Sequence, residues 1–137
     1  MQIEVNNVVT VEKDELIAGV RRYNDAMAGP ANTMPLTVLA RADDGRLMGG
    51  VSGRTVYWHF LIEVLWVDEQ YRGQDLGRTL MERAEHVART RGCVAAQVDT
   101  LSFQAPGFYR KLGFEAIGTI DDFPAGFQRY FLLKRYG

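Results

Sequence analysis

The spacing of apolar residues along the chain predicts two amphipathic helices. Apolar side chains recur every three or four positions in each of them, which places them on one helical face. The first helix is expected to begin at the acidic residues near Glu12 and to end at Gly29. The second is expected to span about Leu76 to Thr90, with Glu85 and Arg89 pairing one turn apart on its polar face.

Short runs of β-branched and aromatic residues predict strands before, between and after these helices. The expected strands cover residues 3–11, 36–42, 46–57, 60–67, 94–100, 114–120 and 127–133. The run 60–67 is apolar except for Glu63, so we expect a central strand that is buried on both faces. Glycine and serine at positions 49, 50, 52 and 53 predict a bulge or a close backbone approach. A short helix capped by Ser102 is expected to end at Gly113.

This order of elements predicts a protein of mixed α and β structure, with helices packed against one sheet. A chain of 137 residues most simply forms one domain, spanning residues 1–137. The net charge of −1 argues against a nucleic-acid binder that works through bulk charge. No apolar run is long enough for a membrane span, and no signal peptide precedes the first strand, so we expect a cytoplasmic protein without a membrane partner. Cys93 is the only cysteine, and no cluster of metal ligands surrounds it.

The most informative stretch follows the apolar run and opens the second helix. It contains Gly73 and Gly77 between Arg72 and Arg78. The first turn of a helix has free N–H groups and about half a positive charge, so a strand, a glycine turn and a helix in succession suit a phosphate or pyrophosphate. An ordinary strand–turn–helix junction is the alternative interpretation of the same residues.

Two motifs resemble those of the GNAT superfamily of acyl-CoA-dependent N-acetyltransferases. Residues 65–67 with 72–78 resemble the family's strand and pyrophosphate loop, in which Gln or Arg is followed at fixed spacing by two small residues. Residues 105–114 resemble its later segment with Phe-Tyr before Gly-Phe. The resemblance implies a single mixed, mostly antiparallel sheet flanked by helices, of class α/β (α+β type), and transfer of an acetyl group from acetyl-CoA to a primary amine without a metal.

The sequence departs from the loop motif at Asp75, where the family usually has glycine. A carboxylate directed at a pyrophosphate would repel it, so we expect the Asp75 side chain to cap the second helix instead. The resemblance assigns the donor site to the strand residues, the loop and one residue further on. These are Leu65, Trp66, Val67, Arg72, Gly73, Gln74, Asp75, Leu76, Gly77, Arg78 and Ser102.

Acyl transfer to an amine also requires groups that move protons. Glu63 is the best candidate for the base that deprotonates the amine, directly or through water, because a carboxylate in an apolar strand must be paired or face a cavity. A structural pair with an arginine is the alternative role for Glu63, and His59 is the alternative base. Tyr109 matches the family's general acid, which protonates the leaving thiolate; its alternative role is core packing beside Phe108.

The acceptor is expected to be a small cationic molecule, bound opposite the donor by polar and aromatic residues of the first helix and of the last loop. These residues are Tyr23, Asn24, Asp121, Asp122 and Phe123. Two other functions stay open, namely acetylation of protein N-termini or lysines and a non-catalytic CoA-binding module. A homodimer is compatible with the sequence, which does not determine the oligomeric state.

Overall fold

The computed structural model describes all 137 residues, which form two compact units, Met1–Ala31 and Asn32–Gly137. The first unit contains helix α1 (Glu12–Ala28), which ends at Gly29 with a φ of 79°. The prediction of a strand over residues 3–11 is wrong, because no residue there has strand structure. Its Val and Ile residues satisfy only a local preference, and a strand also needs a neighbour for its backbone groups. No helix of the chain is both long and apolar enough to cross a membrane.

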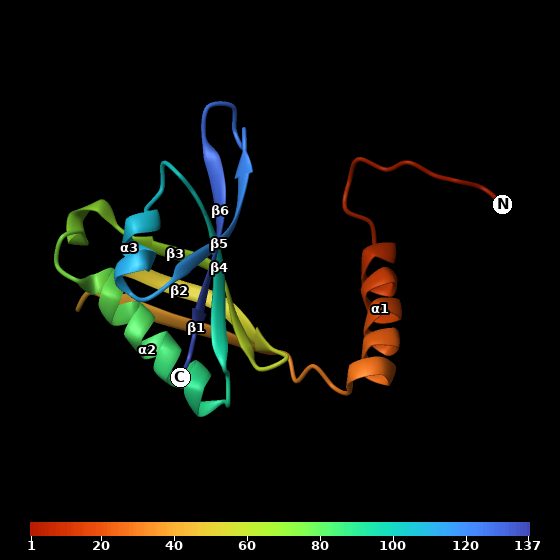
Figure 1. Ribbon diagram of the computed structural model, residues 1–137, viewed down its shortest axis with the longest axis horizontal. Helices are drawn as coiled ribbons and strands as arrows, with labels where there is room; N and C mark the ends of the chain where they lie inside the picture. The colour runs from red at the N-terminus through yellow and green to blue at the C-terminus, as the bar shows by residue number, and fades with distance from the viewer. The chain divides into compact units, whose positions relative to one another are not determined.

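The second unit contains a six-stranded sheet with the order β1-β2-β3-β4-β6-β5 (Figure 1). Its strands are β1 (Met34–Arg41), β2 (Leu47–Val56), β3 (His59–Val67), β4 (Ala95–Leu101), β5 (Glu115–Asp121) and β6 (Gln128–Arg135). All neighbouring pairs are antiparallel except β3 and β4. The expected mixed, mostly antiparallel sheet is therefore confirmed.

Strands β3 and β4 pair over only a short length and then separate. Parallel pairing joins His59–Leu61 to Ala95–Gln97, whereas β3 continues to Val67 and β4 to Leu101. The remaining backbone groups on the facing edges of these two strands have no strand partner. This divergence opens the middle of the sheet.

A β-bulge lies in β3 just beyond the paired segment. Ser52 pairs with Val64 and Gly53 pairs with Ile62, so Glu63 is an additional residue between two pairs. A Cβ atom at Gly53 would lie 2.1 Å from the carbonyl oxygen of Leu61, which explains why a glycine stands opposite the bulge. The bulge and close approach predicted from the glycine-rich strand are thus both present.

The bulge changes which side chains of β3 face the core. Before it, Phe60 and Ile62 are buried; after it, Leu65 and Val67 pack against the core, while Val64 and Trp66 are exposed. The expectation that β3 is buried on both faces is therefore wrong. A continuous apolar run can arise in two ways. Either the strand is buried on both faces, or it is buried on one face while a bulge shifts the buried positions from even-numbered to odd-numbered residues.

Two helices of the second unit pack on the same face of the sheet (Figure 1). Helix α2 (Leu76–Thr90) has the predicted bounds and buries Leu80, Met81, Ala84 and Ala88 against strand residues such as Ala96 and Val98. Helix α3 (Pro106–Lys111) follows β4 and contributes Tyr109 to the same core. A single 3-10 turn, η1 (Glu69–Tyr71), links β3 to the loop before α2.

The polar face of α2 differs from the prediction at Glu85. Its side chain is buried and accepts a hydrogen bond from Lys134 on β6 at 2.8 Å, and not from Arg89. Arg89 lies instead over the ring of Tyr136. Burial, together with the nearby Glu85 carboxylate, raises the pKa of Tyr136. The Glu85–Lys134 pair therefore connects α2 to the sheet inside a partly dehydrated cluster.

Loss of Lys134 is expected to destabilise the fold strongly, because it leaves the Glu85 carboxylate buried without a cationic partner. We expect Lys134→Met to lower the free energy of unfolding by about 2–4 kcal/mol, measured by urea denaturation. The double variant Glu85→Gln, Lys134→Met carries no unpaired charge and should recover part of this loss. Equal denaturation midpoints for the single and double variants would contradict this role.

Candidate active site

A cleft of about 780 Å³ lies where β3 and β4 diverge. Both strands contribute to its walls, together with the loop before α2 and the start of α3. Its lining includes most of the residues predicted for donor binding and catalysis, namely Glu63, Leu65, Trp66, Val67, Arg72, Gly73, Asp75, Leu76, Gly77, Arg78 and Tyr109. The structure thus brings the two sequence motifs together around one cavity.

The main chain of β3 presents hydrogen-bonding groups to this cleft. The N–H of Asp68 donates to Met48 on the β2 side of the strand. Because successive residues of a strand direct their N–H and C=O groups to opposite edges, those of Leu65 and Val67 point toward β4, from which β3 has diverged. The Val67 carbonyl already accepts a hydrogen bond from Nε of Arg72 at 3.1 Å.

Free backbone N–H groups gather at one end of the cleft. No backbone or side-chain acceptor bonds to the N–H groups from Gly73 to Arg78, which include the first turn of α2. The helix dipole adds positive potential at the same place. Arg72 and Arg78 also line the cleft, and Arg78 forms an exposed ion pair with Glu82 at 3.3 Å. The arrangement suits a phosphate or pyrophosphate group.

Asp75 occupies the position before the first residue of α2, but its side chain does not cap the helix. Its φ of 61° lies in the left-handed region, which favours glycine and which aspartate adopts more readily than most residues. Its main-chain carbonyl, rather than its carboxylate, accepts from Thr79. The predicted capping bond is therefore absent, and an exposed carboxylate remains beside the free N–H groups.

Tyr109 lies between two aromatic rings in the wall of the cleft. Its ring contacts Phe108 and Phe114 edge to face, with centroids 5.2 and 5.7 Å away. Burial, and next the negative charge of Asp99, raise the pKa of its hydroxyl. The hydroxyl therefore stays protonated at neutral pH, which a proton donor requires. Tyr109 therefore packs in the core and also lines the cleft, a position compatible with both roles considered for it, general acid and core packing.

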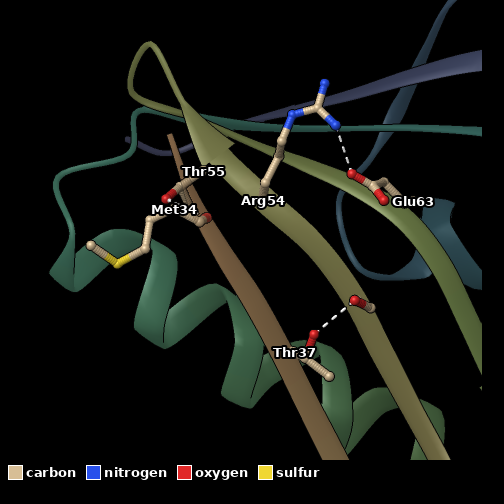
Figure 2. Close-up of polar contacts among 6 residues, drawn as sticks. Met34, Thr37, Arg54, Thr55 and Glu63 are labelled. Carbon is tan, nitrogen blue, oxygen red and sulfur yellow. Dashed lines mark hydrogen bonds and ion pairs between the residues drawn. The ribbon is translucent and has the colours of Figure 1, made fainter. Parts of the chain in front are cut away.

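Glu63, the additional residue of the bulge, directs its carboxylate toward Arg54 on β2 (Figure 2). The Oε1 atom of Glu63 accepts from Arg54 at 2.7 Å, and about half of each side chain is exposed, 53% and 48% respectively. The alternative foreseen for Glu63, a pair with an arginine, is therefore present. Glu63 also lines the cleft, so pairing does not remove it from the site. His59 lies at the paired start of β3 and contacts Gln97 instead.

Two predicted donor-site residues do not line the cleft, namely Gln74 and Ser102. Ser102 joins β4 to β6: its N–H donates to the Gln128 carbonyl, and its hydroxyl accepts from the Gln128 N–H at 3.0 Å. It does not cap α3, whose N-terminal cap residue is Ala105. The next residues, Phe103 and Gln104, do line the cleft. The sequence gives no signal that the cleft contact lies at these residues and not at Ser102, because the position of Ser102 depends on the pairing of β4 with β6.

The predicted acceptor residues divide between the two units. Tyr23 and Asn24 belong to α1 in the first unit, whereas Asp121, Asp122 and Phe123 lie at the turn from β5 to β6. Asp122 supports that turn by accepting from the Gly126 N–H at 3.4 Å. Asp121, Asp122 and Phe123 are not among the residues that line the cleft. Sequence reasoning also missed Tyr71 and Asp99, two polar residues of the cleft.

The sheet opened between two parallel strands, the anion site at a helix N-terminus and the buried tyrosine agree with the fold and site that the resemblance to acyl-CoA-dependent N-acetyltransferases implies. Residues 8–114 match the model of the acetyltransferase (GNAT) family. The chain therefore belongs to the GNAT family of N-acetyltransferases, and both the resemblance and the enzyme class expected from the sequence are confirmed.

Relatives and solved structures agree with this assignment. The chain is 43% identical to the blasticidin-S acetyltransferase of Streptomyces morookaense. The aligned 128 residues cover 92% of each chain. It is 34% identical to an acetyltransferase of Agrobacterium fabrum over 90% of this chain and 88% of the other. A crystal structure of an acetyltransferase from Bacillus cereus matches with a TM-score of 0.89, 30% identity and 98% coverage of both chains.

Asp75 is expected to weaken binding of the anionic donor, because its carboxylate adds negative charge beside the free N–H groups. Asp75→Asn removes the charge and keeps a residue that tolerates positive φ, whereas Asp75→Gly also removes the backbone strain. We expect both variants to bind CoA about three- to tenfold more tightly by calorimetric titration at low salt, with the gain reduced at high salt. Unchanged affinity in Asp75→Asn would mean that the carboxylate does not reach the ligand.

Proposed function

We propose that this enzyme transfers the acetyl group of acetyl-CoA to a primary amine of a small cationic molecule. The observation that carries the proposal is a single cleft that holds free N–H groups at one end and both Glu63 and Tyr109 along its walls. A small acceptor is favoured by the relatives, since the 43% identical protein is named for acetylation of blasticidin S. The cytoplasm is the proposed compartment, and a homodimer is one proposed assembly.

In the proposed complex, the N–H groups of residues 73–78, with Arg72 and Arg78, hold the pyrophosphate of the donor. The exposed main-chain edge of β3 at Leu65 and Val67 bonds the amides of the pantetheine arm, as an added strand would. The donor supplies a thioester carbon that an amine can attack. Arg72 must then exchange or share its bond to Val67 when the phosphate groups arrive.

Glu63 and Tyr109 divide the proton transfers of the reaction. An ammonium has no free electron pair, so Glu63 removes a proton from the acceptor, directly or through water. Arg54 occupies only Oε1 of Glu63, which leaves the second carboxylate oxygen for the acceptor. Tyr109 gives a proton to the leaving thiolate, and its raised pKa keeps that proton available throughout the neutral range.

The turn residues Asp121, Asp122 and Phe123 are proposed to add further contacts to the acceptor. A panel of small amines and peptides, assayed with acetyl-CoA by detection of released thiol, tests the function as a whole. Turnover of amines identifies an amine acetyltransferase. Turnover of peptides alone would replace the small acceptor with a protein, and CoA binding without turnover would favour a non-catalytic module.

Tyr109→Phe removes only the hydroxyl, so packing against Phe108 and Phe114 should persist and CoA should bind as in the wild type. Without the proton donor, we expect kcat to fall about 10²- to 10⁴-fold. Rapid-quench or steady-state thiol assays measure this loss, and calorimetry checks binding. Near-normal kcat in a folded variant would exclude the acid role.

Glu63→Gln keeps the size of the side chain but removes the proton acceptor. We expect a lower kcat, measured by steady-state thiol release at saturating acetyl-CoA and acceptor. Arg54→Met is the matched control, because it breaks the same ion pair and keeps the carboxylate. If Arg54→Met and Glu63→Gln lose the same activity, Glu63 acts only as part of the pair.

A further inference from the structure

We propose that Asp99 determines acceptor specificity by binding a second cationic group of the acceptor, separate from the amine that is acetylated. The proposal rests on the proposed function and defines its acceptors more closely, as compounds with two positive charges. Diamines and amines that carry a guanidinium group are the chemical classes concerned.

The first argument is the position of Asp99 in the diverging part of the sheet. Asp99 lies on β4 two residues beyond Gln97, the last β4 residue paired with β3, and is among the residues that line the cleft, as are Glu63 and Tyr109. Its neighbours Val98 and Thr100 are buried, whereas 52% of the Asp99 side chain is exposed. The alternation of a strand therefore turns this carboxylate away from the core that α2 covers.

The second argument is how the carboxylate is held. Nη2 of Arg129 on β6 forms an ion pair with Oδ2 of Asp99 at 3.0 Å, and no protein group bonds to Oδ1. The Arg129 guanidinium lies 5.2 Å from the ring centroid of Phe123 and 4.8 Å from that of Phe131. The two rings and the ion pair fix the orientation of Arg129, and thereby that of Asp99. One carboxylate oxygen thus remains in the cleft as a positioned hydrogen-bond acceptor.

The third argument is that the cleft contains two such carboxylates with different tasks. Glu63 and Asp99 stand on the two diverging strands, and each forms an ion pair with an arginine on the next strand of the sheet, β2 or β6. The attacking nitrogen must lose its proton, so a carboxylate that kept it as an ammonium would oppose the reaction. Two carboxylates therefore suit an acceptor with two cationic groups, one deprotonated through Glu63 and one that keeps its charge at Asp99.

The charge of Asp99 also extends to the reacting region, because it is the second cause, after burial, of the raised pKa of Tyr109. A cation bound at Asp99 would consequently lie near the proposed acid, as an acceptor engaged in transfer must.

The test compares matched acceptors in the wild type and in Asp99→Asn. 1,4-Diaminobutane carries the second charge, and n-butylamine has the same chain without it. The ratio of kcat/KM for the diamine to kcat/KM for the monoamine should fall about 10- to 100-fold in Asp99→Asn, mainly through KM, which is the usual range for a charge-assisted hydrogen bond. Asp43→Asn makes the same change of charge in the exposed turn between β1 and β2 and should leave the ratio as in the wild type.

Calorimetric titration of the diamine into the CoA-bound protein tests the proposal without turnover. Affinity reduced about 10- to 100-fold in Asp99→Asn supports it, whether or not the diamine is acetylated. An unchanged kcat/KM ratio overturns the proposal, because a purely structural Asp99 would lower kcat/KM for both acceptors alike. Equal diamine affinity in the wild type and in Asp99→Asn overturns it as well. The proposed function fails separately, when the wild type releases no thiol with any amine.

Discussion

The insertion of one residue at Glu63 is the local constraint on which the geometry of the cleft depends. The bulge shifts the alternation of side chains along β3 by one residue. Phe60 and Ile62 therefore face the core before the bulge, and Leu65 and Val67 face it after the bulge. It lies directly beyond the last residues that pair with β4. A regular strand would keep one side-chain alternation throughout and would turn Leu65 and Val67 away from α2. The same residue also places a carboxylate in the opening that it helps to create.

The anion site follows from the direction in which β3 leaves the sheet. The 3-10 turn at Glu69–Tyr71 reverses the chain, and two residues of positive φ, Gly73 and Asp75, leave the loop N–H groups without internal partners. Helix α2 then begins against the core through Leu80 and Ala84. The packing of α2 therefore offsets the free-energy cost of a loop whose backbone N–H groups lack hydrogen-bond partners. A ligand with acceptor atoms can supply those partners, which is why such a loop suits an anion.

Periodicity was sufficient to predict most elements of the second unit, because each apolar stripe corresponds to one buried face. Helix α2 agrees at both ends, and glycines 49 and 53 indicated the irregular pairing of β2 with β3. Contacts between elements that are distant in sequence could not be predicted in this way. Lys134 is the partner of Glu85 across 49 positions, and Arg129 meets Asp99 only because β6 pairs with β4. The strand expected at residues 3–11 failed for the same reason, since local composition does not specify a pairing partner.

Positive and negative groups occupy different parts of the cleft, and this separation suggests where each of the two proposed substrates binds. Arg72, Arg78 and the free N–H groups make the α2 end positive, while Glu63 and Asp99 place carboxylates on the diverging strands. Each of these carboxylates is bonded to an arginine on one oxygen only, so it remains an acceptor without being an isolated charge. An anionic donor and a cationic acceptor would then enter from different ends and meet beside Tyr109. Asp75 is the exception to this pattern, because it places a carboxylate at the positive end of the cleft.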